Sequence, residues 1–383
     1  MDTQLQRYEK LLVNEKIARP GRIALAAQND RLCYLGPTEL KELTSLLLQQ
    51  LDCCAIIVGE PNLPYGDLLI QRSTPPVTVL TPRDSESRSS LHAIPCVPFT
   101  HTTTTLARQI CDALQTRKGC IVEGLGLVSL GSLTVEQAYI VWSSLVHATT
   151  IKYFEDLLTS GPHLKQEAAL LQRCRAEYLQ PLQPAAYYQG QHQLTEQPDE
   201  IIKEICAVGR ATVMMGLVDS FFGNVSCATE EGLYISQTSA RLDELQQQID
   251  FVPANGSSTS GITASSELPA HRAIVAATGC RTILHGHPRF SVIMSFFADS
   301  KEADNWQQLD GIPVVRGEGG VGGLAENLSA AFRNSGSNAV IVQGHGVFAI
   351  SRHNFREPLI TLTKVEQQCR NMYFRRIAER FGI

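Results

Sequence analysis

The sequence predicts an α/β protein made of two modules, each with a sheet between two layers of helices. Three observations support this prediction. Short apolar runs typical of buried strands alternate with helical stretches along the whole chain. A weak internal repeat relates the two halves of the chain. At 383 residues, the chain is also long enough for two domains.

The predicted strands are short apolar runs that alternate with the helices. They are residues 53–59, 77–80, 120–124, 233–236, 281–286 and 339–344. Each half ends in a long helical pattern, at 134–158 and at 356–381. Each half also begins alike, with a predicted helix followed by a β-hairpin, at roughly 3–40 and 199–245. The order of elements therefore predicts the same architecture twice.

The internal repeat is clearest around two Ile-Pro segments. Residues 94–107 (IPCVPFTHTTTTLA) and 312–325 (IPVVRGEGGVGGLA) begin and end alike. A strand with a double-glycine turn follows each of them, and Leu125 in the first turn matches His345 in the second. The repeat indicates two copies of one module with different side chains at this turn.

Composition and charge exclude several classes of protein. The chain is 43% apolar and 19% charged, as is usual for a globular protein, and its net charge of -5 argues against nucleic-acid binding. Eleven scattered cysteines without a CxxC pair indicate reduced thiols in the cytoplasm. The polar start MDTQLQRYEK is not a signal peptide, and no apolar run is long enough to cross a membrane. We therefore expect a cytoplasmic protein that acts on a small molecule.

Metal-ligand side chains are concentrated in one segment, 265–290. They are Glu267, His271, His285 and His287. A further histidine, His345, lies in the sequence QGHGVF. Because side chains alternate along a strand, His285 and His287 point to the same face, and with a carboxylate and a third imidazole they suit a divalent cation. The alternative, separate core or surface histidines, is disfavoured by four such residues around one strand.

The first half of the chain has no counterpart of this segment. It passes from a strand at 76–82 through the polar loop RDSESRSS directly to the Ile-Pro motif. We therefore expect residues 198–383 to be a metal-binding module and residues 1–160 to be a degenerate copy that lacks the metal site. Residues 161–197, rich in Gln, Pro and Tyr toward their end, are expected to form a linker after a short helix.

The second half resembles the class II aldolase and adducin family, which is typified by L-fuculose-phosphate aldolase. The resemblance covers about 199–383 and rests on motifs in a fixed order: GNVS (223–226), ISQTSARLDEL (235–245), SSELPAH (265–271) with HGHP (285–288), and GHG (344–346). It implies a three-layer α/β/α class II aldolase-like module that is present twice, with a degenerate N-terminal copy.

The resemblance also implies a role for each motif residue. His285, His287 and His345 match the histidine ligands of a divalent metal, usually zinc in the aldolases, with iron, manganese or cobalt as alternatives. Glu267 matches the carboxylate that completes the metal site and acts as general acid and base. A metal ion can hold both oxygens of an enediolate while a carboxylate moves the proton. The implied enzyme is a lyase that cleaves or forms a C–C bond in a small hydroxy-carbonyl compound, such as a sugar phosphate.

Two other functions remain open. Relatives of the family include decarboxylases, epimerases, dehydratases and oxygenases that use the same kind of metal site. Adducin-like members are non-catalytic interaction proteins, and they tend to lose the metal ligands that this chain retains. Fold alone does not decide among these functions.

Four polar residues match family positions at the substrate phosphate: Asn224, Thr238, Ser265 and Ser266. Hydroxyls and backbone N–H groups near a helix N-terminus suit an anion. The family turn ends in Thr-Gly, whereas this chain has Thr238-Ser239, and glycine would allow closer backbone approach. Ser265 and Ser266 also have a second interpretation, as the cap of the following helix.

The catalytic tyrosine of the aldolases is missing. In the family it follows the Ile-Pro motif and reaches the site of a neighbouring subunit. Here residues 316–323 read RGEGGVGG, and Phe99 holds the matching position in the first half. Phenylalanine cannot donate a proton, whereas His101, two residues later, can. Either the first module lends this loop, with His101 as a catalytic residue, or it serves only as scaffold.

The family usually assembles as a four-fold ring with sites between subunits. Two chains of two modules would form a pseudo-four-fold ring with two metal sites. Because oligomers close by symmetry, we expect a homodimer, with a different ring or a higher oligomer as the alternative.

Overall fold

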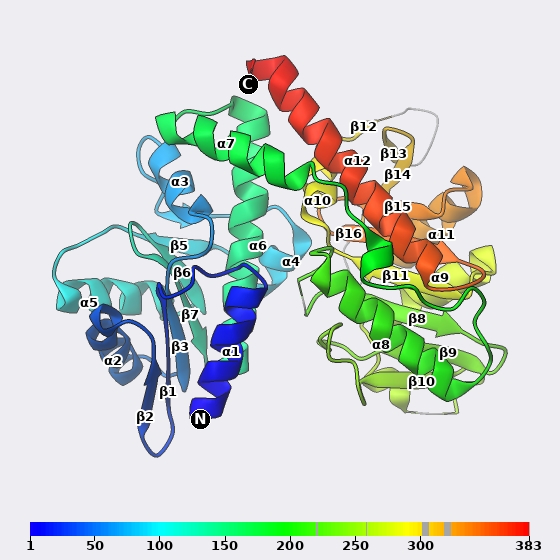
Figure 1. Ribbon diagram of the computed structural model, residues 1–383, viewed down its shortest axis with the longest axis horizontal. Helices are drawn as coiled ribbons and strands as arrows, with labels where there is room; N and C mark the ends of the chain where they lie inside the picture. Colours follow the sequence, from blue (N-terminus) through cyan, green and yellow to red (C-terminus); the bar gives the residue numbers. More distant parts are fainter. Residues whose placement is uncertain (220, 258, 301–305, 318–322, 383) are drawn as a thin grey trace. The chain divides into compact units, whose positions relative to one another are not determined.

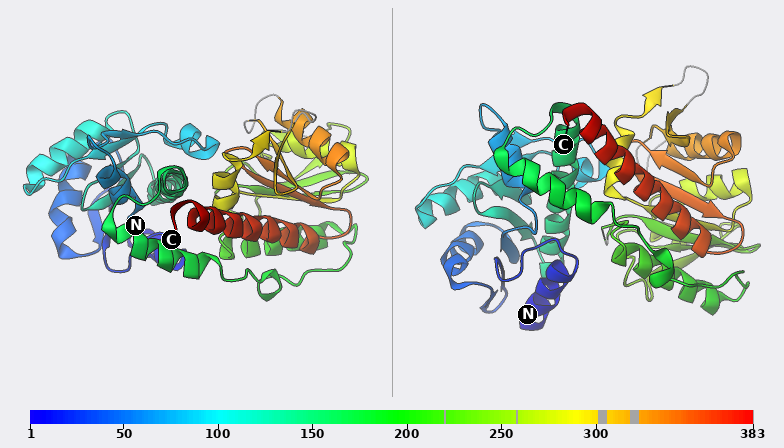
Figure 2. Two further views of the ribbon diagram at one scale, coloured as in Figure 1. Left: turned by 90° about the horizontal axis from the view of Figure 1, so that it is seen from above. Right: turned by 45° about the horizontal axis from the view of Figure 1, so that its top comes forward.

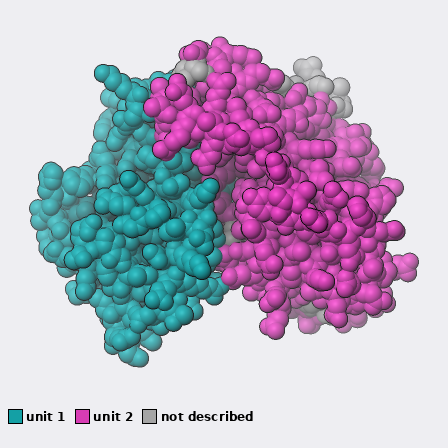
Figure 3. All heavy atoms as spheres, viewed as in Figure 1, with its two compact units in different colours: residues 1–167 teal, residues 168–383 magenta. Residues whose placement is uncertain are grey.

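The chain folds as two compact units, Met1–Glu167 and Ala168–Ile383 (Figure 3). The computed structural model describes residues 1–219, 221–257, 259–300, 306–317 and 323–382. Each unit contains one sheet with helices on both faces (Figures 1 and 2), which confirms the predicted α/β fold class. The boundary between the units lies inside the predicted linker, and the exact domain ends stay a prediction.

The first unit alternates strands and helices along the chain. Its elements are α1 (Asp2–Asn14), β1 (Ile23–Gln28), β2 (Leu32–Leu35), η1 (Thr38–Leu40), α2 (Lys41–Gln50), β3 (Ala55–Gly59), α3 (Tyr65–Arg72), β4 (Val79–Leu80), α4 (Ser85–Ser90), β5 (Ile94–Val97), α5 (Thr103–Leu114), β6 (Gly119–Val122), β7 (Gly126–Gly131) and α6 (Val135–Ser160). The sheet order is β2-β1-β3-β7-β6-β5-β4. Helices α2 and α5 cover one face through an apolar cluster, and α1, α3 and α6 lie on the other.

The second unit repeats this alternation. After α7 (Lys165–Tyr178) and η2 (Pro184–Ala186), its elements are α8 (Pro198–Met214), β8 (Asn224–Ala228), β9 (Gly232–Ser236), β10 (Ile249–Pro253), η3 (Ser260–Ile262), α9 (Leu268–Thr278), β11 (Thr282–Gly286), α10 (Arg289–Ser295), β12 (Asp299–Ser300), β13 (Gln307–Leu309), β14 (Ile312–Val315), α11 (Leu324–Ser335), β15 (Ala339–Val342), β16 (Gly346–Ser351) and α12 (Arg356–Phe381). Helices α9 and α11 pack on one face of the sheet, and α8, α10 and α12 lie on the other.

The two sheets have the same topology. The order in the second sheet is β10-β9-β8-β11-β16-β15-β14-β13-β12. Its seven inner strands, from β9 across to β13, correspond one by one to the strands of the first sheet from β2 across to β4. Strands β10 and β12 are added at the two edges. Neighbouring strands are antiparallel in both sheets, apart from the parallel pairs β5–β6 and β14–β15. Each unit ends in a helix of 26 residues, α6 or α12. The shared topology supports an internal duplication, which stays a proposal.

The strand registers show which residues of the first unit stand where the second has its histidines. Val58, Glu60 and Leu125 hold the positions of His285, His287 and His345. Val58 is buried in the apolar core and the partly buried Leu125 packs against it, and neither side chain has an atom that can bind a metal. Glu60 instead accepts hydrogen bonds from Arg19 at 2.8 Å and from Arg22 at 2.5 Å. These positions of the first unit therefore serve packing and an ion pair.

The segment between α7 and α8 packs against the second unit. The Tyr188 hydroxyl donates to the Glu204 carboxylate on α8, and the Leu194 N–H donates to the His353 carbonyl oxygen at 3.1 Å. Tyr188 and Leu194 are both buried. This part of the predicted linker is thus held in place by the second unit.

Helix α12 holds the start of α10, the helix that follows His287. The buried Glu366 carboxylate accepts from the N–H groups of Phe290 at 3.3 Å and Ser291 at 2.9 Å, and from Arg370 Nε at 2.8 Å. These bonds supply partners for N–H groups at the first turn of α10, which a helix cannot satisfy internally. The segment that follows β11 is thereby fixed to α12.

The long helices of the chain cover sheets. In the part of the chain that the structure describes, we find no helix with both the length and the apolar character that crossing a bilayer requires.

Candidate metal centre

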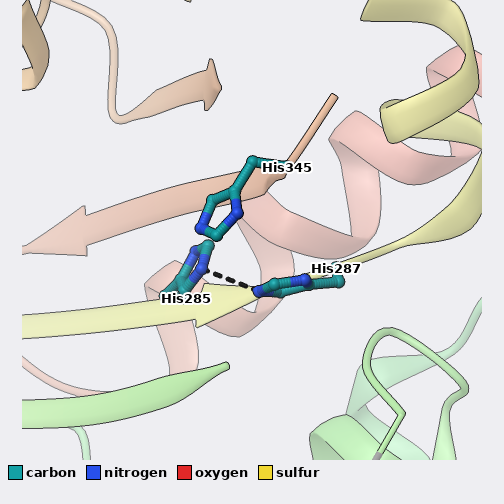
Figure 4. A group of neighbouring side chains, drawn as sticks. All are labelled: His285, His287 and His345. Atoms are coloured by element: carbon teal, nitrogen blue, oxygen red, sulfur yellow. Dashed lines mark hydrogen bonds between the residues drawn. The ribbon is translucent and has the colours of Figure 1, made fainter. Parts of the chain in front are cut away.

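Three buried histidines of the second unit meet at one point. The ligand-type nitrogens of His285, His287 and His345 lie within 4.8 Å of one another, and the rings point toward one another (Figure 4). The two Nε2 atoms of His285 and His287 are 2.9 Å apart. All three side chains are at most 2% exposed. The structure thus brings together the three histidines that the sequence grouped as metal ligands, and their ligand role stays a prediction.

The ends of the central strands bring these rings together. His285 lies near the end of β11, and His287 follows two positions later, so the alternation of a strand directs both side chains to the same face. His345 lies in the tight turn between β15 and β16. The next residue must be glycine, because a Cβ atom on Gly346 would lie 2.4 Å from the Gly286 carbonyl oxygen and 2.9 Å from the His285 ring.

Glu267 adds a carboxylate to the same point. It precedes α9 and is 6% exposed. Its Oε1 lies 2.9 Å from His345 Nε2, and its Oε2 lies 3.3 Å from His285 Nε2. Burial raises the pKa of the Glu267 carboxyl, but the adjacent His285 and His345 and a hydrogen bond from Asn224 outweigh burial and hold that pKa well below its ordinary value. The site therefore favours the ionised carboxylate.

The donor set fits a divalent cation. His285 Nδ1 lies 3.0 Å from the Val347 carbonyl oxygen, a contact that requires the proton on Nδ1 and leaves an electron pair on Nε2. That Nε2 faces His287 Nε2 and the Glu267 carboxylate. These donor atoms contact one another through shared protons, and a divalent cation could replace those protons. Nitrogen and carboxylate ligands of this kind suit zinc and other first-row metals.

His271 lies outside the three-histidine group, although the sequence placed it among the candidate ligands. Its Nε2 is 2.5 Å from Asn224 Oδ1, and its Nδ1 is 2.6 Å from the Ser226 hydroxyl. The ring is fully buried, and burial lowers the pKa of His271 to about 3, so the imidazole is neutral near pH 7. Asn224 in turn donates from Nδ2 to Glu267 Oε2 at 2.7 Å.

The other predicted substrate residues lie in the turn after β9 and in the segment just before Glu267. The Thr238 hydroxyl donates to the Ala264 carbonyl oxygen at 3.0 Å, which joins two loops of the site. The Ser265 hydroxyl accepts from the Glu267 N–H at 3.3 Å, in the turn before α9, and Glu267 itself holds the N-cap position of that helix. Ser266 is exposed. The cap interpretation of the two serines and the binding of substrate by these residues both stay predictions.

Ser239 has a backbone conformation that favours glycine. Its φ is 59°, in the left-handed region that glycine enters without strain. The turn at Thr238-Ser239 thus has a conformation that glycine would favour, and its role in substrate binding stays a prediction.

His101 lies in the first unit, in the loop after β5. It is exposed, and its ring meets that of Phe99 edge to face at 4.9 Å between centroids. The matching loop of the second unit, 316–323, lies mostly outside the described residues. The catalytic role of His101 stays a prediction.

Sequence reasoning missed two phenylalanines that hold the histidine rings. Phe348 stacks on His285 with ring centroids 3.9 Å apart, and Phe222 stacks on His287 at 5.5 Å. Phe348 stands directly opposite His285 in the β11–β16 pair, so strand pairing could have identified it. Phe222 comes from the loop before β8, and no periodic signal marks it.

A comparison with known families finds a match for the second unit. Residues 203–373 match the family model described as Class II Aldolase and Adducin N-terminal domain. This range contains Glu267, Asn224 and the three histidines. No curated protein sequence matches the chain significantly.

Several solved structures resemble about half of the chain. One is L-fuculose-1-phosphate aldolase from Thermus thermophilus, with 24% identity over 48% of this chain and 97% of its own, at a TM-score of 0.42. A second is a putative aldolase/epimerase/decarboxylase from Klebsiella pneumoniae, with 23% identity over 47% of this chain and 91% of its own, at a TM-score of 0.41. A third is a sugar-phosphate aldolase from Thermotoga maritima, with 17% identity over 48% of this chain and 97% of its own, at a TM-score of 0.36.

We predict that Ser239→Gly stabilises the second unit. Glycine removes the cost, about 1–2 kcal/mol, of holding a residue with a side chain in the left-handed conformation. It also lowers stability by about 0.5–1 kcal/mol, because the unfolded chain gains conformational entropy at a glycine. The expected net gain in free energy of unfolding is about 0.5–1 kcal/mol, measured by urea denaturation. Ser257→Gly, at an exposed loop serine with ordinary φ, is the control and should give no gain. A loss of stability for Ser239→Gly would show that the serine is not strained in this turn.

Proposed function

Residues 203–373 belong to the class II aldolase and adducin family, and from this membership we propose that the chain is a metal-dependent lyase. Its reaction is the cleavage or formation of a C–C bond in a small hydroxy-carbonyl compound, with a sugar phosphate as the leading substrate class. Family membership supports an aldolase-like or related activity, and the type of reaction is the proposal.

One observation carries this proposal. Three buried imidazoles and one ionised carboxylate converge on a single point of the second unit. Burying such groups together costs free energy even where they bond to one another, and a divalent cation that binds all of them would offset that cost. The retained donor set therefore favours a catalyst over an adducin-like interaction module.

We propose that His285, His287 and His345 hold the cation, with Glu267 at the same site. A divalent cation, when bound, supplies a Lewis acid that draws electron density from substrate oxygens, and zinc is our leading choice. Glu267 is the group that moves a proton at carbon. In the direction of bond formation it removes the proton next to the carbonyl, and in cleavage it returns that proton to the enediolate carbon.

The reaction needs a second proton carrier at oxygen. When the C–C bond breaks, its electron pair moves toward the carbonyl and the substrate hydroxyl loses its proton as the new aldehyde forms. We propose that His101, lent by the first unit of a neighbouring chain, takes this proton and returns it in the reverse direction. Its exposure and its imidazole ring, which can both accept and donate a proton, suit this role.

The polar end of the substrate is proposed to bind between two loops. Asn224, Ser265 and Ser266 offer amide and hydroxyl hydrogens near the start of α9, and the Thr238-Ser239 turn lies across from them. A helix N-terminus favours an anion through its free N–H groups and its dipole. A phosphate or carboxylate is therefore the expected end group.

We propose a homodimer as the working assembly. Two chains of two topologically similar units can close a pseudo-four-fold ring, in which each metal site lies next to a first unit of the partner. This assembly would account for a first unit that keeps the fold but has Val58, Glu60 and Leu125 at the ligand positions.

We predict that Glu267→Gln abolishes proton transfer at carbon while metal stays bound. Glutamine keeps the size and one oxygen ligand but cannot serve as a base, and loss of a general base costs about 10²–10⁴-fold in rate. The measurement is deuterium uptake from D₂O by dihydroxyacetone phosphate, with metal content determined in parallel. The unphosphorylated ketone, run alongside, tests whether a phosphate is required. Glu326→Gln, at an exposed position of α11, is the matched control. Unchanged exchange in Glu267→Gln would remove its role as base.

We predict that His101→Ala slows C–C cleavage by at least about tenfold but leaves deuterium uptake at carbon intact. The two readouts separate because His101 is assigned to oxygen and Glu267 to carbon. His92→Ala, in the same unit, is the control. Equal cleavage rates in His101→Ala and the unsubstituted protein would mean that His101 takes no part in catalysis and that the first unit serves as scaffold.

A further inference from the structure

We infer that His271 is a positioning residue that orients the Glu267 carboxylate through Asn224. The inference rests on the proposed metal site but adds a residue to it. His271 touches neither the converging nitrogens nor any position where a substrate is expected. It acts from behind the site, through a chain of hydrogen bonds within the second unit.

The chain begins at a buried serine. Ser226 lies in β8 and is 0% exposed, and its hydroxyl is 2.6 Å from His271 Nδ1. His271 Nε2 is 2.5 Å from Asn224 Oδ1, and Asn224 Nδ2 is 2.7 Å from Glu267 Oε2. Three consecutive short contacts therefore lead from the sheet to the carboxylate.

The direction of each bond follows from the groups available. An amide oxygen accepts only, so His271 must carry its proton on Nε2 to donate to Asn224. Its Nδ1 is then an acceptor, and the Ser226 hydroxyl is the donor that faces it. A fully buried imidazole is also expected to be neutral, which permits one proton only. The Asn224 oxygen thus selects the tautomer of His271, and Ser226 supplies the matching donor to its Nδ1.

The Glu267 carboxylate, which only accepts, fixes the orientation of the Asn224 amide, and the His271 N–H holds it there. Rotation of the amide by half a turn would place its oxygen against the Glu267 carboxylate and its NH₂ group against the donating His271 N–H. Both contacts would be repulsive. The N–H donated to Oε2 therefore fixes one oxygen of Glu267, while Oε1 faces His345. The second hydrogen of the Asn224 NH₂ group is left for a substrate.

Local helix geometry places His271 for this task. Glu267 and His271 are four residues apart, which puts them on one face of the first turn of α9. The His271 N–H donates to the Glu267 carbonyl oxygen at 3.0 Å, so the backbone of the two residues is coupled as well. The motif ExxxH therefore contains both the carboxylate and the residue that positions it.

The test measures cobalt binding, which needs no substrate. Apoprotein is titrated with Co²⁺ against a competing chelator, and the visible spectrum of the loaded protein reports the ligands. His271→Leu keeps an apolar contact with Phe348 but removes the donor, and removal of such an outer partner weakens metal binding by about 10- to 100-fold. His271→Gln restores an N–H at the Nε2 position and is expected to bind within about threefold of the unsubstituted protein.

A double-mutant cycle shows whether His271 acts through Glu267. In the Glu267→Ala background, His271→Leu should change the cobalt affinity by no more than about twofold, because the carboxylate that it positions is gone. The spectrum of His271→Leu should shift toward that of Glu267→Ala. If His271→Leu does not fold, Ser226→Ala takes its place in the cycle. Ser226→Ala is expected to lower the cobalt affinity of the otherwise unsubstituted protein and to leave that of the Glu267→Ala variant unchanged.

Two outcomes would overturn the inference. Equal losses in both backgrounds would mean that His271 acts through general stability, and no loss in the unsubstituted background would mean that it positions nothing. Failure of the proposed metal site has a separate signature, which is cobalt affinity unchanged in His345→Ala. Failure of the proposed lyase chemistry would leave the cycle unaffected, because no substrate takes part.

Discussion

Three imidazoles and a carboxylate share one buried volume, where they can contact one another only with a proton or a cation between them. This constraint explains much of the second unit. The side chains come from the start of α9, from the end of β11 and the residue after it, and from the β15–β16 turn, and each must be held in that contact. Where the groups behind them are rigid, the protein can present a prepared site to a cation with little rearrangement.

The rigid groups lie on every side of the site. The Val347 carbonyl fixes the tautomer of His285, and Phe348 and Phe222 fix ring planes. Glu366 anchors the helix that follows His287. The chain from Ser226 through His271 and Asn224 holds Glu267. The ligands are thus supported by the sheet, by α12 and by α9, which means that the fold itself sets the geometry of the site.

The first unit shows the same fold without that constraint. Its sheet has the strand order of the second, but valine and leucine replace two of the histidines, and the third position is a glutamate paired with arginines. No converging electron pairs need support at these three positions. Fold and site are therefore separable in this chain, and the first unit is free for another role, such as supplying a loop.

Sequence reasoning could predict the parts that depend on pattern. Alternating apolar runs predicted the α/β class, and spacing two along a strand placed His285 and His287 together. The approach of Glu267 to His345, 78 residues away, followed from family resemblance and not from spacing. The bond from His271 to Asn224 depends on how α9 packs against β8, and the left-handed turn at Ser239 opposes the preference of serine. Such features need coordinates, because local propensity does not specify them.

The most direct test of this account is elemental analysis of the purified protein and of its His345→Ala variant. The account predicts about one zinc, iron, manganese or cobalt ion per chain, lost in the variant while the circular dichroism spectrum stays unchanged. Absence of metal after addition of divalent ions, or equal metal content in the two proteins, would contradict the central claim that the three histidines form a metal site.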